Sequence, residues 1–335
     1  MFNKIYEYIR KTLSNNYKSI LFFILVLFFA TFKLPFYISA TGGLLDVSKR
    51  IVIENSSKVE GSFNMAYVSE MHATIPLYII SLFNKNWDIV KKEDIVYENE
   101  SYEDSITRGK ILLEESINNA ILVASKKAGR SVSESDHGIV VIYISNESDT
   151  DLKIGDYIKK IDNTEINRIE DISFIKDYQI GKKIDIKVKN GKKDFERYAN
   201  LIEIDNEAKI GVSLIETKKI KTDYEYKLKF KSGESGPSGG LITTLSIYNY
   251  LTDFDITKGR KIAGTGTIDL DGAVGSIGGV KYKLAGVVKD RADIFLVPAG
   301  ENYEEAVAYK KKNNYKIEIV SISTFDEALE YLMSH

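Results

Sequence analysis

The sequence contains no cysteine, and its 335 residues include only three histidines. The absence of cysteine excludes a disulfide framework, a thiolate metal site and a cysteine nucleophile. The formal net charge is −2, so no electrostatic feature indicates nucleic-acid binding. No residue pattern predicts a cofactor or a metal ion. A catalytic serine in this chain would have few histidines to serve as its base, namely His72, His137 and His335.

A long apolar run near the N-terminus predicts a membrane segment. Residues 19–32 are unbroken apolar sequence, and beyond Lys33 the run continues to Ala40, so we expect an anchor over 19–40. Basic residues outnumber the single acid in 1–18, which predicts a cytoplasmic N-terminus and an extracellular remainder. The alternative is a cleaved signal peptide, although Ile38-Ser39-Ala40 is a poor cleavage site.

The chain is long enough for about two domains beyond the anchor. In 41–128 we expect a strand, a short helix, a polar connection and a long helix with apolar residues at helical spacing. Their ranges are Lys58–Val68, Pro76–Phe83, Asn84–Tyr102 and Ile106–Ala128. Gly129 ends the long helix.

The pattern changes in residues 129–205. A strand is predicted over Ile139–Ile144, a helix-like segment over Ile169–Tyr178 and an alternating strand over Ile184–Lys189. With Leu152-Lys153-Ile154-Gly155-Asp156-Tyr157-Ile158, these segments resemble a PDZ domain. Such a domain binds an extended peptide at a sheet edge, and Gly138 and Ile139 would begin its ligand-facing strand. The alternative is a small β-domain without a ligand.

A glycine-flanked serine stands out in the C-terminal part. Gly236-Pro237-Ser238-Gly239-Gly240 follows a predicted strand, Tyr226–Phe230, and opens a predicted helix, Leu241–Leu251. Gly278-Gly279-Val280-Lys281-Tyr282-Lys283 places two lysines at the start of another helix. A buried strand, Ile294–Val297, and a terminal amphipathic helix, Phe325–Met333, follow.

The two motifs together predict nucleophilic chemistry. A serine at a helix start meets backbone N–H groups that can hold an oxyanion, and those of Gly236 and Ser238 could donate, whereas Pro237 has none. A lysine can replace histidine as the base if it loses roughly three pKa units from about 10.4, which costs about 4 kcal/mol and requires burial. The alternatives are an N-cap serine and two solvated lysines. A phosphate loop is disfavoured because its Lys-Ser/Thr ending is absent.

These motifs, with Ile262-Ala263-Gly264-Thr265-Gly266-Thr267-Ile268 and Gly272-Ala273-Val274-Gly275-Ser276-Ile277 between them, resemble the proteolytic domain of Lon peptidases. The resemblance is greatest to the membrane-anchored, PDZ-containing YlbL/SepM-type peptidases. It implies that Ser238 is the nucleophile, Lys283 the dyad base and Thr265 a support for the lysine amine. Two positions depart from the Lon pattern, because Ser235 and Thr267 stand where Lon has acids.

The resemblance implies an α+β protein with an N-terminal transmembrane helix, a PDZ-like β-rich domain at 129–205 and a Lon-type proteolytic domain at 206–335. Residues 112–120 also resemble the first helix of that domain, so 41–128 would contain its N-terminal part and the PDZ unit would be inserted. The implied activity is that of an ATP-independent serine endopeptidase at the cell membrane, with peptide or protein substrates, no nucleotide, and self-assembly left open.

Two other functions compete with this interpretation. Gly236–Gly240 also resembles the serine loop of trypsin-like peptidases, but His72 and His137 lack the expected sequence context and the PDZ-like part precedes the serine loop. The second alternative is a catalytically inactive, membrane-tethered PDZ adaptor, which Ser235 and Thr267 favour. A serine-reactive probe would separate enzyme from adaptor.

Overall fold

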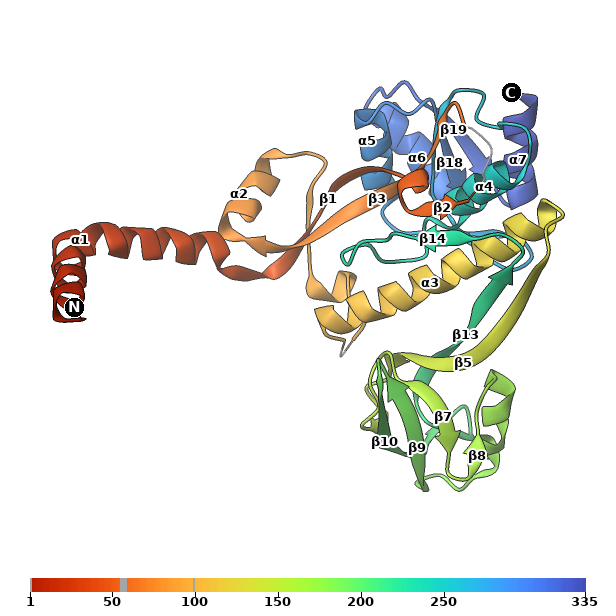
Figure 1. The fold of residues 1–335 in the computed structure, drawn as a ribbon, viewed down its shortest axis with the longest axis horizontal. Helices are drawn as coiled ribbons and strands as arrows, with labels where there is room; N and C mark the ends of the chain where they lie inside the picture. Colours follow the sequence, from red (N-terminus) through yellow and green to blue (C-terminus); the bar gives the residue numbers. More distant parts are fainter. Residues whose placement is uncertain (1, 55–58, 99) are drawn as a thin grey trace. The chain divides into compact units, whose positions relative to one another are not determined.

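The computed structural model describes residues 2–54, 59–98 and 100–335. The chain divides into two compact units, the first comprising 1–41 and 68–95 and the second comprising 42–67 and 96–335. Helices and strands are mixed throughout, which confirms the predicted α+β class (Figure 1).

The first unit begins with the long helix α1 (Phe2–Thr31). Strand β1 (Lys33–Asp46) follows, and β3 (Ser62–Thr74) leads into α2 (Ile75–Phe83) and β4 (Asp88–Val90). Within the described residues, one helix, Ile5–Thr31, is long and apolar enough to cross a membrane, and its most apolar stretch has no buried residue. The first unit therefore contains a candidate anchor.

The predicted limits of the anchor, 19–40, are wrong at the C-terminal end. The helix ends at Thr31, and residues from Lys33 onward form β1. Pro35 cannot continue a helix, since it lacks the N–H and disfavours helical geometry in the residue before it. Ile38 and Ala40 are buried against Ala73 in a small protein core. A helix that spans the membrane must therefore include residues before Ser19.

The helix predicted over Pro76–Phe83 is present as α2, with the proline in its first turn. The polar connection predicted over Asn84–Tyr102 contains β4, which pairs antiparallel with β1, and a 3-10 turn, η2 (Lys92–Asp94). The paired segment of β4, Asp88 to Val90, has three residues, which is too short to show an alternating strand pattern in the sequence.

The second unit contains most of a six-stranded sheet, of order β19-β18-β15-β3-β1-β4, in which β15 (Lys261–Gly264) has a parallel neighbour on each side. Strand β15 pairs with β3 on one side and with β18 (Ile294–Pro298) on the other, and β18 pairs with β19 (Glu318–Ile322). Three further helices complete this region: α5 (Val280–Lys289), α6 (Glu301–Lys312) and α7 (Phe325–Ser334). Short antiparallel pairs link β2 (Ile51–Ile53) to β14 (Tyr226–Leu228) and β16 (Thr267–Ile268) to β17 (Val274–Gly275).

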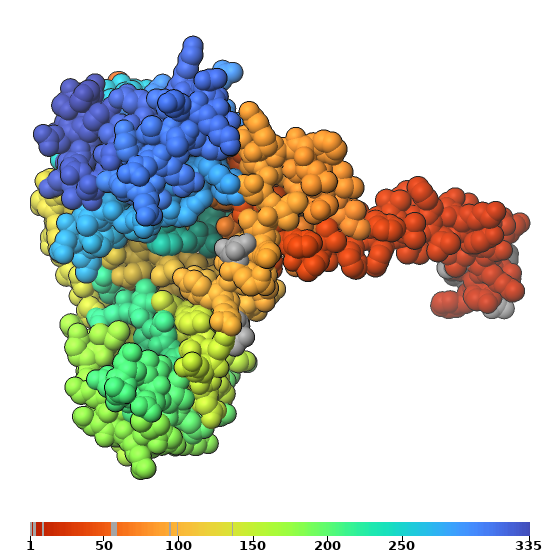
Figure 2. All heavy atoms as spheres, turned by 180° about the vertical axis from the view of Figure 1, so that it is seen from behind, coloured from red at the N-terminus to blue at the C-terminus, as the bar shows by residue number. Residues whose placement is uncertain are grey.

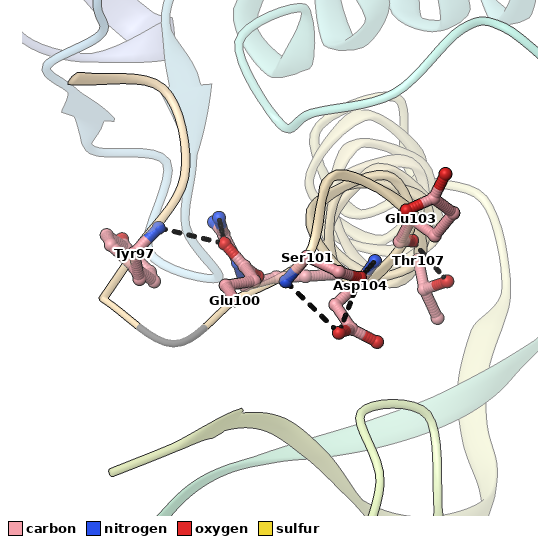
Figure 3. A network of polar contacts seen from close by, with 7 residues as sticks. Tyr97, Glu100, Ser101, Glu103, Asp104 and Thr107 are labelled. Carbon is pink, nitrogen blue, oxygen red and sulfur yellow. Dashed lines mark hydrogen bonds and ion pairs between the residues drawn. The ribbon is translucent and has the colours of Figure 1, made fainter. Parts of the chain in front are cut away.

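Helix α3 (Tyr102–Lys127) starts at a capping box. The Ser101 hydroxyl accepts the Asp104 N–H, and the Asp104 carboxylate accepts the Ser101 N–H (Figure 3). Next to it, Glu100 accepts the Tyr97 N–H and pairs with Arg108 at 2.7 Å. Two reciprocal bonds satisfy helix N–H groups that would otherwise lack partners. This is why α3 begins four residues before the predicted Ile106.

The main hydrophobic core draws on both sides of residues 129–205. Helix α3 packs on α4 (Gly240–Leu251), so Ile117 and Ile121 meet Leu241 and Leu245. Residues before α3, such as Phe63, belong to the same core. The segment between α3 and β14 is therefore inserted into a single folded body.

Residues 132–222 build a second, smaller core. Its sheet runs in the order β13-β5-β7-β9-β10-β6. The strands are β5 (Val132–Ile144), β6 (Asp149–Thr150), β7 (Tyr157–Ile161), β9 (Lys183–Asn190), β10 (Lys193–Asn200) and β13 (Val212–Thr222), with β8 (Thr164–Glu165) beside β7 and the hairpin β11 (Ile202–Ile204) and β12 (Glu207–Lys209). The predicted helix-like segment is a 3-10 helix, η3 (Ile169–Asp177). The buried residues include Ile139, Ile158 and Ile186.

Candidate active site

Ser238 lies in the turn that leads directly into α4, whose N-cap residue is Gly239. The turn packs tightly against its surroundings. A Cβ on Gly240 would lie 2.7 Å from the backbone nitrogen of Ile268 and 2.9 Å from the Ser116 hydroxyl. Only glycine fits there, because real Cβ atoms do not approach so closely. The glycine-rich motif thus allows the serine turn to lie against α3 and β16.

Thr265 follows the C-terminal end of β15 and is fully buried. Its N–H donates to the Leu296 carbonyl of the neighbouring strand at 3.0 Å. Lys283 lies in the first turn of α5 and is only 3% exposed. Gly279, the N-cap of α5, has φ of 72°, a left-handed conformation that favours glycine. The Gly-Gly pair in the sequence thus sets the start of the helix that carries the lysine.

One chain of hydrogen bonds joins the three predicted site residues. The Lys283 amine donates to Thr265 Oγ1 at 3.0 Å, and the Thr265 hydroxyl donates to the Ser238 carbonyl at 3.1 Å. The Gly266 N–H donates to the same carbonyl at 2.8 Å. Two donors therefore fix the backbone of Ser238, and one of them is fixed in turn by the lysine. The structure brings together residues that are separated by 45 positions at most in the sequence.

The two lysines of the motif differ sharply in environment. Lys281 is partly exposed and its ammonium lies 4.9 Å from the ring centroid of Tyr282. Lys283 is buried and bonded to Thr265. Burial disfavours the charged form of an amine, as a general base requires. Of the two, Lys283 is the lysine whose surroundings suit that role.

The predicted oxyanion donors need a correction. The Gly236 N–H donates to the Gly109 carbonyl of α3 at 2.8 Å, so it is not available to a substrate in this structure. The N–H groups of Ser238 and Gly239 meet no acceptor among the residues that the structure describes. Both lie at the positive end of α4, where backbone N–H groups favour an anion.

Contacts that the sequence did not reveal hold the serine turn in place. The Ser116 hydroxyl of α3 donates to the Pro237 carbonyl at 3.0 Å. Arg50 binds the carboxylate of Glu234 through both Nε and Nη2, with Nε 2.8 Å from Oε2. Burial alone would raise the pKa of Glu234, but the hydrogen bonds from Arg50 and from the Lys231 N–H outweigh it and lower that pKa.

The three histidines contact other parts of the chain. His72 stacks on Tyr37, His137 lies 2.9 Å from Glu216, and His335 stacks on Tyr331. Throughout the described ranges, none of them contacts Ser238, which disfavours the trypsin-like alternative. No cluster of three metal-ligating side chains is found there either.

The predicted peptide edge at Gly138 and Ile139 is wrong at Ile139. Strand β13 pairs with β5 along most of its length, placing Thr217 opposite Gly138 and Glu216 opposite Ile139. On the other side, Ile139 is opposite Ile158 of β7. Ile139 is therefore paired on both sides and offers no open edge, whereas Gly138 is paired on the β13 side only. The sequence could not show this, since β13 lies far along the chain from β5.

Comparisons with known proteins bear on the region that contains this site. Residues 184–335 match the family model described as the Lon protease (S16) C-terminal proteolytic domain. All three site residues lie within this Lon-like region.

Three curated Lon proteases illustrate the similarity. Those of Neorickettsia sennetsu and Campylobacter jejuni are 31% and 33% identical over 103 residues, which are 31% and 30% of this chain and 12% of each relative. Lon protease 2 of Bacillus subtilis is 31% identical over 114 residues, 33% of this chain and 19% of that protein. The chain thus spans between 12% and 19% of the length of these relatives.

Two solved structures are similar to about a quarter of the chain. The PDZ domain of the SdrC-like protein from Listeria monocytogenes is 26% identical, covers 24% of this chain and 90% of its own, and has a TM-score of 0.22. The second domain of a Listeria protein is also 26% identical, with coverages of 23% and 83% and a TM-score of 0.21.

Proposed function

We propose that this protein is an ATP-independent, membrane-tethered serine endopeptidase of the YlbL/SepM type, in which Ser238 is the nucleophile and Lys283 the general base. The observation that carries the proposal is the buried Lys283 amine, bonded to Thr265, which is itself bonded to the backbone of Ser238. A lysine can activate a serine only from such a desolvated position.

In the proposed reaction, neutral Lys283 accepts the proton of the Ser238 hydroxyl as its oxygen attacks the peptide carbonyl. The resulting lysine ammonium then gives that proton to the leaving amine, and an acyl-enzyme ester remains. Lys283 then takes a proton from the water that attacks the ester and passes it to the Ser238 oxygen as the ester bond breaks, which releases the new carboxyl end and restores the serine and the neutral lysine. Each step balances without a cofactor.

The negative oxygen of the tetrahedral intermediate would lie against the start of α4. We assign the donors there to the N–H groups of Ser238 and Gly239, since that of Gly236 is bonded to Gly109. Donors fixed in advance and aimed at a developing charge lower the barrier most. The bonds to the Ser238 carbonyl fix the peptide plane that carries the Gly239 N–H, and the Ser116 bond to the Pro237 carbonyl fixes the plane that carries the Ser238 N–H.

The substrate is proposed to be an exposed segment of a peptide or partly unfolded protein near the membrane. The Gly236–Gly240 loop lacks the Lys-Ser/Thr ending of a nucleotide loop, which supports ATP-independent action. The β-rich segment at 129–205 is proposed to assist substrate recognition. Helix α1, in which basic residues precede the apolar run, is proposed as a single-pass anchor with a cytoplasmic N-terminus and an extracellular catalytic domain.

A test compares three alanine variants in a peptide-cleavage assay and in labelling by a fluorophosphonate probe. Ser238→Ala and Lys283→Ala should each lower kcat/KM by a factor on the order of a thousand or more, and the double variant should lose little beyond that. Lys281→Ala is the matched control and should remain active. Activity that survives in Lys283→Ala but not in Lys281→Ala would show that the wrong lysine is assigned. A folded wild type that neither cleaves nor labels would favour the adaptor.

A further inference from the structure

Helix α2 has an unusual composition for a surface helix. No charged residue lies between His72 and Lys85, and within Ile75–Phe83 only Tyr78 and Ser81 carry a polar group. The Ser81 hydroxyl donates to the Tyr78 carbonyl at 2.7 Å, so it is satisfied within the helix. A polar face, which an amphipathic surface helix would turn to water, is missing.

The two sides of α2 have different surroundings. Leu77, with Trp87 just beyond the helix, packs against the small core formed by Ile38, Ala40 and Ala73. Four large apolar side chains are uncovered, and their exposed fractions are 51% for Ile79, 49% for Ile80, 60% for Leu82 and 86% for Phe83. The orange segment containing α2 lies on the surface in the space-filling view (Figure 2). A contiguous apolar patch of this kind marks an interaction site.

The fold of the first unit places this patch beside the end of α1. His72 Nε2 lies 3.0 Å from the Leu34 carbonyl. His72 is three residues before α2 begins, and Leu34 is three residues after α1 ends, so each connection spans at most about 10 Å. Helices α1 and α2 also contact each other. The exposed apolar surface of α1 therefore continues onto α2.

We propose that the exposed face of α2 inserts into the bilayer interface beside α1, as a second membrane contact of the chain. With nine residues, α2 is about 14 Å long and cannot cross a hydrocarbon core of about 30 Å. An apolar helix of this length suits the boundary between headgroups and acyl chains. Tyr78 and Trp87 are the residue types that favour that boundary, and Lys33 and Lys85 can extend toward the headgroups.

This inference rests on the proposed anchoring by α1 but not on the peptidase chemistry. The alternative occupant is the same face of a second copy. We favour lipid because the patch is continuous with α1. The most apolar stretch of α1 has no buried residue.

Trp87 is the only tryptophan and serves as a built-in probe. The full chain would be reconstituted into vesicles of phosphatidylcholine and phosphatidylglycerol, with lipids that carry a nitroxide quencher at the headgroup level or deep in the acyl chains. Phe83→Trp combined with Trp87→Phe moves the probe to the most exposed residue. Phe254→Trp with Trp87→Phe is the control, since Phe254 is 45% exposed and lies in the second unit.

We expect the shallow quencher to reduce emission from positions 87 and 83 at least twofold, to act more strongly than the deep quencher, and to leave position 254 unchanged. Ile80→Asp with Phe83→Asp should remove the quenching at Trp87, whereas Val307→Asp, at a residue that is 38% exposed, should not. Vesicle flotation is measured on every sample. Wild-type protein that floats with the vesicles while its Trp87 emission stays unquenched would overturn the inference. An unquenched Trp87 in protein that dimerises as its concentration rises would also overturn it, in favour of a second copy on this face. Wild type that does not float would refute the anchor itself, while the peptide-cleavage assay reports separately on the enzyme.

Discussion

Replacing Thr265 with valine should remove the hydrogen bonds that link Lys283 to the backbone of Ser238, while the buried side chain keeps its volume. Valine fills the same buried volume but lacks the hydroxyl, so the bond from Lys283 and the bond to the Ser238 carbonyl are both lost. The carbonyl keeps its bond from the Gly266 N–H, so most of the loss falls on the lysine. A hydrogen bond of a buried amine is worth about 1–3 kcal/mol, which corresponds to a factor of about 5 to about 150 in rate.

The matched variant is Thr265→Ser, which keeps the hydroxyl and loses one buried methyl group. It should cleave a peptide at nearly the wild-type kcat and lose about 0.8 kcal/mol of unfolding free energy. The assay is kcat on an unstructured peptide, with thermal unfolding measured in parallel. If Thr265→Val cleaves within twofold of wild type, or if the serine variant is as slow as the valine variant, the hydrogen-bond chain has no role in catalysis.

Three further predictions concern the rest of the chain. Deleting 138–200 and bridging the ends with a short linker should slow cleavage of a physiological protein more than cleavage of a short peptide, and equal slowing would make this segment a spacer. Arg50 lowers the pKa of Glu234, so its stabilisation is complete above the unfolded value of about 4.3 and is lost as pH falls through the lower folded value. Thermal unfolding of Glu234→Gln should therefore differ from wild type at pH 7 and converge with it at strongly acid pH; a constant difference would contradict this. Protease added to wall-free cells should leave only a short N-terminal fragment, whereas a fully protected catalytic part would reverse the orientation.

The sequence predicted best where the pattern is local. The apolar spacing in Ile106–Ala128 gave a helix that the structure extends to Tyr102–Lys127, and the terminal helix was expected at Phe325–Met333 and found at Phe325–Ser334. Ser238 and the lysine pair stood out because glycines mark tight turns beside them, whereas Thr265 and the choice of Lys283 came from the resemblance to Lon peptidases. Such turns allow few other residues at those positions.

Features that depend on distant pairing could not be predicted. Arg50 and Glu234 are 184 residues apart, and nothing in either neighbourhood indicates the other. Strand β4 exists because β1 lies beside it, since three residues carry no strand pattern of their own. The same holds for Ile139, which pairs with β13 from a much later part of the chain. Local sequence indicates which secondary structure a segment prefers. These contacts depend instead on which distant segments the complete fold brings together.

The pairing of β5 with β13 has a consequence for how the chain folds. Val132 is opposite Thr222, so the chain leaves and rejoins the main body at neighbouring points. Without that pairing, the peptidase core would have to close the whole inserted segment as a loose loop, at an entropic cost on the order of 4 kcal/mol. An insertion that folds first holds its own ends together and presents α3 and β14 to each other already close. Helix α3 then has only a short distance to move before it packs on α4 beside Ser238, even though α3 and α4 are distant in sequence.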